Sequence, residues 1–159
     1  MEPGFKRFAR TGKKAKVTYI SYIDTLSQIA GIKEKLLAYQ SFLRADPSHA
    51  KTCKLIQYLE PVSYGKKYKT DLYRETVMKI KDEIVKEFGS KVISIKTEAL
   101  NEKLRLLLWA RTDILLNTTL RGGLRLLTLE YIAVRCLLGK QSRSCIVSSE
   151  FAEGIRVLC

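Results

Sequence analysis

Short apolar runs alternate with longer segments of helical periodicity from Lys16 onward, and this alternation constrains the fold of the chain more than any other feature. A strand, a covering helix and a further strand form a unit whose strands are parallel and whose crossover is right-handed. Repeated units of this kind build an open sheet with helices on both faces. The pattern therefore predicts an α/β fold, a doubly wound parallel sheet of the Rossmann type.

The apolar runs predict strands over residues 17–20, 55–59, 92–95, 114–117 and 145–148. The periodic segments predict helices over residues 32–43, 71–88, 100–110 and 124–138. In the second of these helices we expect Leu72, Val77 and Ile84 to face inward. Ligands of such sheets bind outside the carboxyl ends of the strands. We therefore expect the functional site among the loops that follow Ile20, Leu59, Ile95, Asn117 and Ser148.

The length and composition fit one compact domain, because 46% of the 159 residues are hydrophobic. We expect a basic lead segment over residues 1–16 and a single domain over residues 17–159. The longest apolar runs fall short of the roughly 20 residues that a membrane span needs, and no secretory signal is visible. The four cysteines lack the paired spacing of zinc sites. We therefore expect free thiols, no metal, no membrane and a cytoplasmic location.

The formal charge of +13 favours a polyanionic partner, such as nucleic acid, an acidic membrane or a phosphorylated substrate. Basic residues gather within residues 6–16 and again within residues 66–69, with Phe5, Phe8, Tyr64 and Tyr68 close to them. Aromatic side chains of this kind could stack on bases. Charge runs usually mark solvated faces, however, and no nucleic-acid docking motif accompanies them. A basic interaction module is thus an alternative, and nucleic acid is not the partner that we expect.

Two loops carry signals for a ligand. Residues 118–125 leave an expected strand, turn on Gly122 and Gly123 and open a helix. Such a turn directs backbone N–H groups and about half a positive charge at whatever lies in front, which suits a diphosphate, and Arg121 and Arg125 would add full charges. Glycines are also common at tight turns that bind no ligand. The second loop is the polar segment 148–151, which follows the last expected strand. Its serines could contact a ligand, but they could also cap a helix.

The order of these segments resembles the trehalose-6-phosphate synthases, the retaining glycosyltransferases of family twenty with the GT-B fold. The family has a helix close to Lys-Leu-Leu-Ala-Phe-Glu-x-Phe-Leu, and residues 35–43 read Lys-Leu-Leu-Ala-Tyr-Gln-Ser-Phe-Leu. Its Thr-Pro-Leu-Arg-Asp-Gly-Met-Asn-Leu and Glu-Tyr-Val-Ala segments are matched in register by residues 118–126 and 130–133. A family Leu-Ser-Glu-Phe-Ala-Gly segment is matched by residues 148–153.

The resemblance runs from about Tyr19 to Cys159 and implies the C-terminal, donor-binding lobe of a GT-B glycosyltransferase. It implies UDP-glucose as a possible donor ligand and no cofactor. The amino-terminal lobe, which in the family helps to hold glucose 6-phosphate, is not covered. The chain also stops before the family's last strand, so we expect the domain to be incomplete at its C-terminal end. A missing N-terminal lobe or a partner chain would then complete an enzyme.

Several functional positions of the family carry other residues here. The Arg and Lys that clamp the donor diphosphate in the family fall on Thr25 and Ala30, and the Asp that contacts the glucosyl hydroxyls falls on Gly122. The family's Asn falls on Arg125, and the Arg of a Ser-Arg pair falls on Tyr64. Charge-assisted contacts of this kind are worth roughly 1.5 to 3 kcal/mol each. We therefore expect no catalytic residue in this chain and no catalysis by the chain alone.

The resemblance nevertheless implies that a donor site is retained. Its expected members are Gly31, Arg121, Gly123, Leu124, Arg125, Leu126 and Glu130. In the family the residue at Glu130 pairs with the donor ribose hydroxyls, and Arg125 could partly replace the lost cations. The first hypothesis is thus a degenerate, regulatory domain that binds a nucleotide sugar. The second is an active donor half that needs another lobe or chain, and the third is the basic interaction module.

Overall fold

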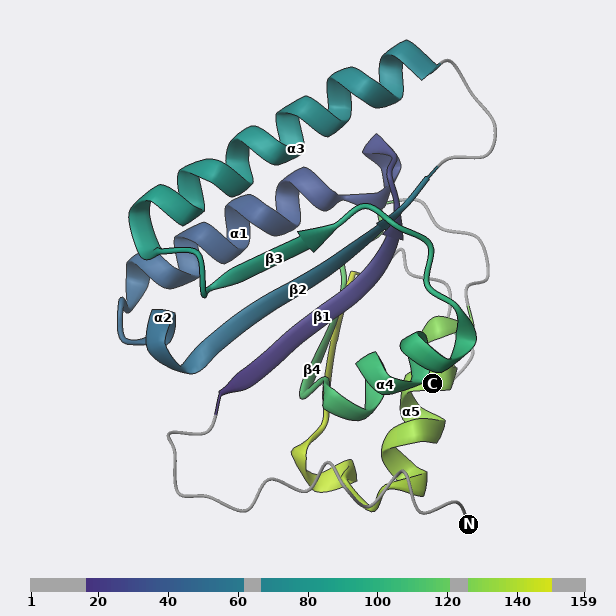
Figure 1. Cartoon of the computed structure of the whole chain (residues 1–159). Helices are drawn as coiled ribbons and strands as arrows, with labels where there is room; N and C mark the ends of the chain where they lie inside the picture. Colours follow the sequence, from purple (N-terminus) through teal and green to yellow (C-terminus); the bar gives the residue numbers. More distant parts are fainter. Residues whose placement is uncertain (1–16, 62–66, 121–125, 150–159) are drawn as a thin grey trace.

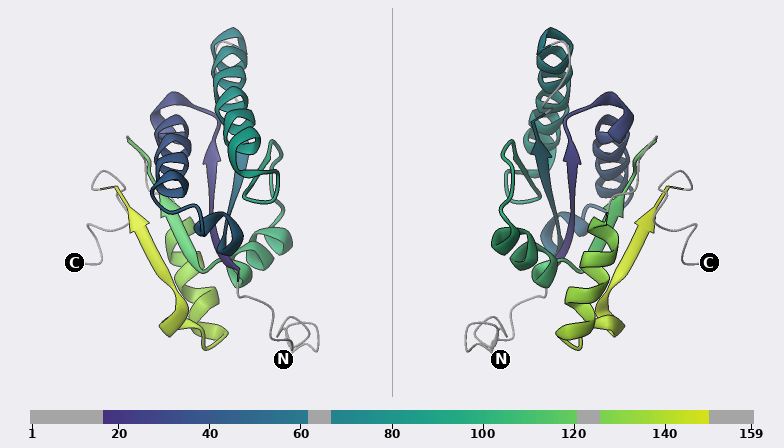
Figure 2. Two further views of the ribbon diagram at one scale, coloured as in Figure 1. Left: turned by 90° about the vertical axis from the view of Figure 1, so that its left-hand side faces the viewer. Right: turned by 90° about the vertical axis from the view of Figure 1, so that its right-hand side faces the viewer.

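The computed structural model describes residues 17–61, 67–120 and 126–149. Within them, all strands belong to one parallel sheet in the order β3-β2-β1-β4-β5. Figure 2 shows the arrowheads pointing the same way. The strands are β1 Thr18–Thr25, β2 Cys53–Glu60, β3 Ile93–Lys96, β4 Ile114–Asn117 and β5 Cys145–Ser148. The strand order reverses direction between β1 and β4, which confirms the predicted doubly wound sheet.

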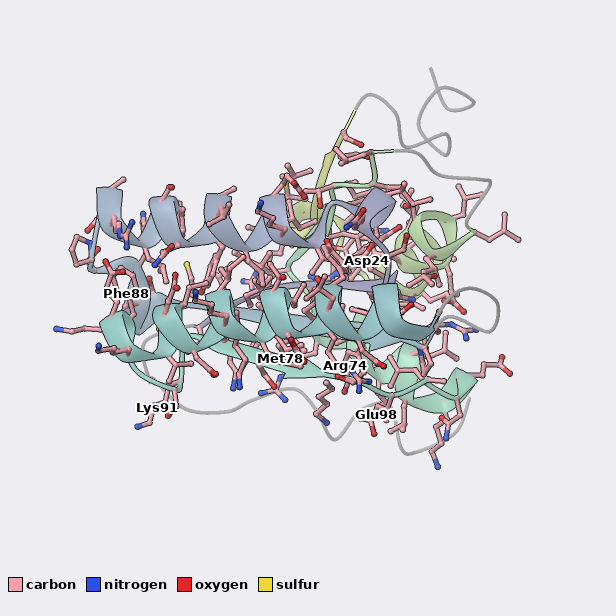
Figure 3. All side chains as sticks on the ribbon, turned by 90° about the horizontal axis from the view of Figure 1, so that it is seen from above. Asp24, Arg74, Met78, Phe88, Lys91 and Glu98 are labelled. Carbon is pink, nitrogen blue, oxygen red and sulfur yellow. The ribbon has the colours of Figure 1, made fainter. Side chains whose placement is uncertain are left out.

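The helices lie in two pairs on the two faces of this sheet (Figure 1). One face carries α1 Ile32–Ala45 and α3 Lys67–Phe88, which lie side by side (Figure 3). The other face carries α4 Glu102–Arg111 and α5 Leu127–Leu137. Short helical turns complete the connections, namely η2 Gln28–Ala30, α2 His49–Thr52 and η3 Gln141–Arg143.

Each face of the sheet has its own apolar core. Under α1 and α3 the core includes Leu36, Leu55, Val77 and Ile84, none of which is exposed to solvent. Under α4 and α5 the core is built from residues that include Ile23, Trp109, Leu115 and Tyr131. The inward positions predicted for Val77 and Ile84 are therefore confirmed. The prediction for Leu72 is wrong, because Leu72 is exposed and its neighbour Tyr73 is buried instead.

The first strand is longer than its apolar pattern indicated. β1 pairs with β2 along its whole length, from Thr18 to Thr25, so the prediction that this strand ends at Ile20 is wrong. The sequence looks like a loop beyond Ile20 because Ser21 and Asp24 are polar. Both side chains are fully buried, and each has an internal partner: Ser21 Oγ bonds to Thr112 Oγ1, and Asp24 pairs with Lys35. The carboxyl end of β1 therefore lies at Thr25.

A buried polar triad fixes α1 to the sheet near this end. Lys35 Nζ lies 2.5 Å from Asp24 Oδ2 and 3.1 Å from Gln57 Oε1, and Gln57 Nε2 donates to the same Asp24 oxygen at 2.9 Å. None of the three side chains is exposed. Burial lowers the pKa of Lys35, and the charge of Asp24 opposes that effect. The ion pair thus specifies the position of α1 within an otherwise apolar core.

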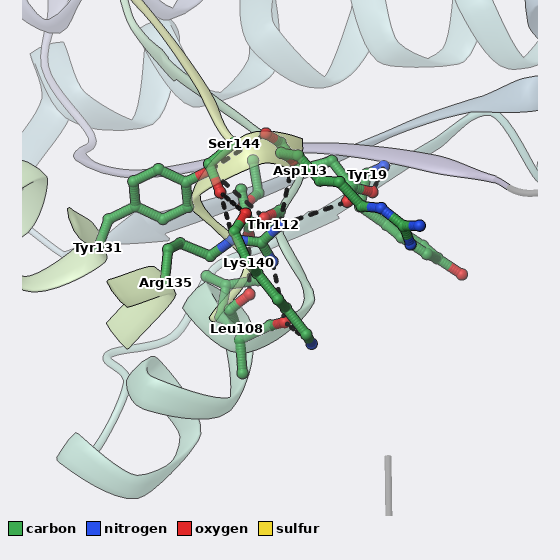
Figure 4. A network of polar contacts seen from close by, with 11 residues as sticks. Tyr19, Leu108, Thr112, Asp113, Tyr131, Arg135, Lys140 and Ser144 are labelled. Atoms are coloured by element: carbon green, nitrogen blue, oxygen red, sulfur yellow. Dashed lines mark hydrogen bonds and ion pairs between the residues drawn. The ribbon is translucent and has the colours of Figure 1, made fainter. Parts of the chain in front are cut away.

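A second polar network closes the opposite, amino edge of the sheet (Figure 4). The buried Arg135 donates from Nε to Ser144 Oγ at 2.6 Å and from Nη1 to the Ala110 carbonyl at 3.1 Å. Its guanidinium also lies 3.6 Å from Asp113 Oδ1, and Tyr131 Oη donates to the Asp113 carbonyl at 3.1 Å. These bonds join the end of α4, the starts of β4 and β5, and the last turn of α5.

Candidate functional site

The candidate site lies at the carboxyl edge of the sheet, between β1 and β4. These strands are neighbours in the sheet although they are not consecutive in the chain. The helices that follow them, α1 and α5, cover opposite faces. The loops after Thr25 and Asn117 therefore diverge from one point, which is where doubly wound sheets bind their ligands.

Gly31 brings the loop after β1 against the loop after β4. Its backbone has φ +67°, a left-handed conformation that favours glycine, and it immediately precedes α1. A Cβ atom at this position would collide with the carbonyl oxygen of Thr118, and Thr118 Oγ1 donates to the Gly31 carbonyl at 3.2 Å. The predicted site residue Gly31 is thus placed at the strand switch point.

The loops after β1, β4 and β5 form one hydrogen-bonded framework. Leu120 N–H donates to the Ile29 carbonyl at 2.9 Å, which connects the first two loops. Ser149 N–H donates to the Asn117 carbonyl at 2.9 Å, and Ser149 Oγ donates to the Thr119 carbonyl at 2.5 Å, which connects the last two. Asn117 Oδ1 accepts from Thr119 Oγ1 at 2.8 Å and so fixes the turn out of β4. Ser149 therefore joins the loop after β5 to the loop after β4 through two hydrogen bonds.

The predicted phosphate-binding turn is described only at its flanks. Arg121, Gly122, Gly123, Leu124 and Arg125 lie outside the described residues. Leu120 ends the described part of the loop, and Leu126 precedes α5 with 61% of its surface exposed. The amino end of α5 carries the partial positive charge of an eleven-residue helix. This end is at the carboxyl edge because α5 runs back toward the amino edge, where it meets η3.

Glu130 lies in the first turn of α5, where its carboxylate contacts two side chains of α4. Oε2 accepts from Arg105 Nε at 2.7 Å and from Trp109 Nε1 at 2.8 Å, and Oε1 accepts from Arg105 Nη2 at 2.9 Å. Trp109 is fully buried and meets Tyr131 edge to face, with 6.1 Å between ring centroids. The hydrogen bonds from Arg105 are the main reason why the pKa of Glu130 lies below its ordinary value.

The positions at which the resembled family has cations carry small side chains. Thr25 is the half-buried last residue of β1. Ala30 is buried in the core under α1 and contributes no polar group. The backbone N–H of Lys33, in the first turn of α1, donates to the hydroxyl of Tyr73 from α3 at 3.2 Å. An internal hydroxyl therefore occupies part of the amino end of α1.

Sequence reasoning missed the partners of Glu130. Arg105 stands within an otherwise leucine-rich stretch, Leu104-Arg105-Leu106-Leu107-Leu108, and a cation within such an apolar stretch is a signal for an acidic partner. Which carboxylate it meets depends on how α4 packs against α5, and that contact is not readable from either helix alone. Asn117 was correctly predicted to end its strand and Thr118 to begin the following loop, but their bonds to other loops were not predicted.

No helix within residues 17–61, 67–120 and 126–149 is long and apolar enough to cross a membrane. Within the same ranges no group of three or more His, Cys, Asp or Glu side chains could hold a metal ion. Cys53, Cys136 and Cys145 are free thiols, as expected, and Cys159 lies outside the described residues.

Comparison with known proteins gives one family and a consistent set of structural relatives. The model of Glycosyltransferase family 20 matches residues 7–159. A relative in Arabidopsis thaliana, the probable UDP-forming alpha,alpha-trehalose-phosphate synthase 3, is 29% identical over 150 residues, which cover 89% of this chain and 17% of that protein.

Solved structures agree in fold. The N-terminal domain of Candida albicans trehalose-6-phosphate phosphatase superposes with a TM-score of 0.79 at 25% identity, over 91% of this chain and 30% of that one. An E. coli trehalose-6-phosphate structure bound with UDP-2-fluoro glucose gives a TM-score of 0.78 at 21% identity, over 89% of this chain and 31% of that one. The chain thus spans less than a third of the length of these two solved proteins and 17% of the Arabidopsis relative.

Proposed function

Because the chain belongs to glycosyltransferase family 20, we propose that it is a trehalose-6-phosphate-synthase-like donor domain that binds a nucleotide sugar without transferring the sugar on its own. On this proposal residues 17–159 form one nucleotide-sugar-binding domain, and residues 1–16 form a basic lead segment. The ligand would be UDP-glucose or UDP. A relative is described as UDP-forming, and a structure of the same fold binds UDP-2-fluoro glucose.

The observation that carries the proposal is the close approach of Gly31 to Thr118 at the strand switch point. It brings the loop after β1 against the loop that leads into the glycine turn, immediately before the amino end of α5. The amino end of a helix attracts phosphate through its N–H groups and its partial charge. In the proposed site Gly31 and Leu126 border the diphosphate, Gly123 and Leu124 offer backbone amides, and Arg121 and Arg125 supply charge.

The proposed loss of catalysis rests on Thr25 and Ala30. Neither side chain can neutralise a departing phosphate, because Thr25 is uncharged and the buried Ala30 contributes no polar group. Two missing charge-assisted contacts of roughly 1.5 to 3 kcal/mol each correspond to about a hundredfold to ten-thousandfold in rate. A degenerate donor domain of this kind would serve as a sensor of nucleotide sugar or as part of a larger protein.

A thermal-unfolding titration tests the proposal. UDP and UDP-glucose are expected to stabilise the chain, by about 2.7 kcal/mol at a hundred times the dissociation constant, whereas glucose alone is not. Arg121→Ala should remove much of this stabilisation, because one charge-assisted contact is worth roughly 1.5 to 3 kcal/mol. Arg143→Ala, which removes an exposed cation at the opposite edge of the sheet, should leave it unchanged. Equal transitions with and without both nucleotides would refute the proposal.

The limited coverage of the relatives favours a second candidate, an active donor half that needs another lobe or chain. It predicts glucosyl transfer from UDP-glucose to glucose 6-phosphate when an amino-terminal lobe of a trehalose-phosphate synthase is added to the chain. Turnover above that of the added lobe alone would favour this candidate over the non-catalytic one. No turnover by the mixture would favour the first.

A further inference from the structure

The carboxylate of Glu130 is already occupied on the edge that a sugar diol would use. The Nε and Nη2 groups of Arg105 form a fork that spans both oxygens, at 2.7 Å and 2.9 Å. Bidentate pairing of this kind is charge-assisted at both bonds and fixes the geometry of the guanidinium against the carboxylate. The edge between the two oxygens is therefore closed by a side chain of the same molecule.

The indole of Trp109 occupies a further acceptor position. A carboxylate offers about four lone-pair positions, two on each oxygen. Trp109 Nε1 donates to Oε2 at 2.8 Å, so Oε2 serves two donors, Arg105 and Trp109. Trp109 is fully buried and packed against Tyr131, whereas the side chain of Arg105 is 28% exposed. Of the two partners, Arg105 is the one that can move.

The two hydroxyls of a ribose are also a side-by-side pair of donors. To bind Glu130 through both, a ribose must take the edge between the carboxylate oxygens, which is the place of the Arg105 fork. The ribose would exchange two bonds in which donor and acceptor are both charged for two in which only the carboxylate is charged, and it would leave Arg105 without its ion-pair partner. The exchange therefore favours Arg105.

We infer that Arg105 is a specificity-determining residue, because it occupies the edge of Glu130 that the two ribose hydroxyls would need. The ribose hydroxyls then add little to binding, so the site accepts ribonucleoside and 2′-deoxyribonucleoside diphosphates alike. The inference rests on the proposed function, because it concerns the same nucleotide site. Glu130 is a structural tie between α4 and α5 until Arg105 is removed.

Calorimetric titration of the whole chain with UDP and with 2′-deoxy-UDP tests the inference. In the unmodified chain the two dissociation constants are expected to agree within about twofold. In Arg105→Met, which removes the guanidinium but keeps a flexible apolar stem, UDP should bind about tenfold or more tightly than 2′-deoxy-UDP, because Glu130 can then accept from the ribose. Adding Glu130→Ala to Arg105→Met should return the ratio to about twofold.

Lys103→Met is the matched control. Lys103 is an exposed cation on the same helix, so its loss changes the net charge equally without touching Glu130. The control should keep the unmodified ratio. A tenfold preference for UDP in the unmodified chain, or an unchanged ratio in a folded Arg105→Met variant, would overturn the inference while leaving nucleotide binding intact. Failure of both nucleotides to bind any of the proteins would overturn the proposed function and the inference with it.

A second measurement does not depend on the stability of the Arg105 variant. Trp109 is the only tryptophan of the chain, so its indole N–H gives a single NMR resonance that reports on the bond to Glu130. UDP should leave this resonance in place in the unmodified chain, because Glu130 keeps its partners. A shift upon addition of UDP but not of 2′-deoxy-UDP would mean that ribose displaces Arg105, and the inference would be wrong.

Discussion

Replacement of Gly31 by alanine tests whether the two loops at the switch point must touch. The substitution has two separate costs. An alanine at φ +67° is strained by about 1 to 2 kcal/mol, and its Cβ would collide with the Thr118 carbonyl oxygen. Relief of the collision separates the loops and breaks the 3.2 Å hydrogen bond from Thr118 Oγ1, which is worth about 1 kcal/mol. We expect Gly31→Ala to lower the free energy of unfolding by about 3 kcal/mol.

Gly139→Ala separates the two costs. Gly139 has a similar backbone, φ +61°, but nothing lies within 4 Å of the Cβ that it would gain. Only the strain applies, and we expect a loss of about 1 kcal/mol. Urea unfolding of the three proteins measures both losses, and the midpoint of thermal unfolding should fall by about 2 to 4 °C per kcal/mol. Gly31→Ala should also weaken UDP binding, whereas Gly139→Ala should not.

The difference between the two alanine variants can contradict this reasoning in two ways. If Gly31→Ala costs no more than Gly139→Ala, the collision with Thr118 is not a constraint, and the loops after β1 and β4 do not depend on glycine for their approach. If Gly31→Ala is destabilising but binds UDP with unchanged affinity, the approach is structural only. The observation that carries the proposed function would then be lost.

Lys35→Ala should cost about 3 to 5 kcal/mol, because it leaves the fully buried Asp24 without its ion-pair partner, whereas Lys33→Ala on the exposed side of α1 should be nearly neutral in urea unfolding. The pKa of Glu130 is lowered from its ordinary value of 4.5 in the folded chain, so its contribution to stability is present above pH 4.5 and is lost as the pH falls through the pKa of the folded state. In Arg105→Met the free energy of unfolding, measured against pH, should therefore fall less in acid than in the unmodified chain. Tyr73→Phe should cost about 1 kcal/mol in thermal unfolding, because the backbone N–H of Lys33 loses its acceptor.

The fold was accessible from the sequence because apolar periodicity and glycine turns act locally. The bounds of β4 and β5 match their predicted ranges, and α1 begins at the predicted residue. The end of β1 was not accessible in this way. Its polar residues Ser21 and Asp24 are compatible with a strand only because Thr112 and Lys35 reach them from opposite faces of the sheet. The hydropathy pattern along the chain does not show which distant residues will pair with Ser21 and Asp24.

In the candidate site, too, single positions could be predicted from the sequence, whereas contacts between helices could not. Gly31 and Glu130 were expected from the resemblance, and both lie at or next to the carboxyl edge. The interaction of Glu130 with Arg105 and Trp109 could not be predicted, since it needs the packing of α4 on α5. Similarly, the exposed Leu72 and buried Tyr73 follow from the angle at which α3 meets α1, where Tyr73 reaches the backbone of Lys33. Helical periodicity alone does not specify this angle.

Saturation-transfer NMR on one sample that contains the chain, UDP-glucose and glucose 6-phosphate measures binding of the donor and its turnover at the same time. Magnetisation should pass from the protein to the uracil and glucosyl protons, while the UDP-glucose signals keep their intensity over hours and no trehalose 6-phosphate signal grows. No transfer to the donor would contradict the claim of binding. Steady conversion of donor and acceptor into trehalose 6-phosphate by the chain alone would contradict the claim that catalysis is lost.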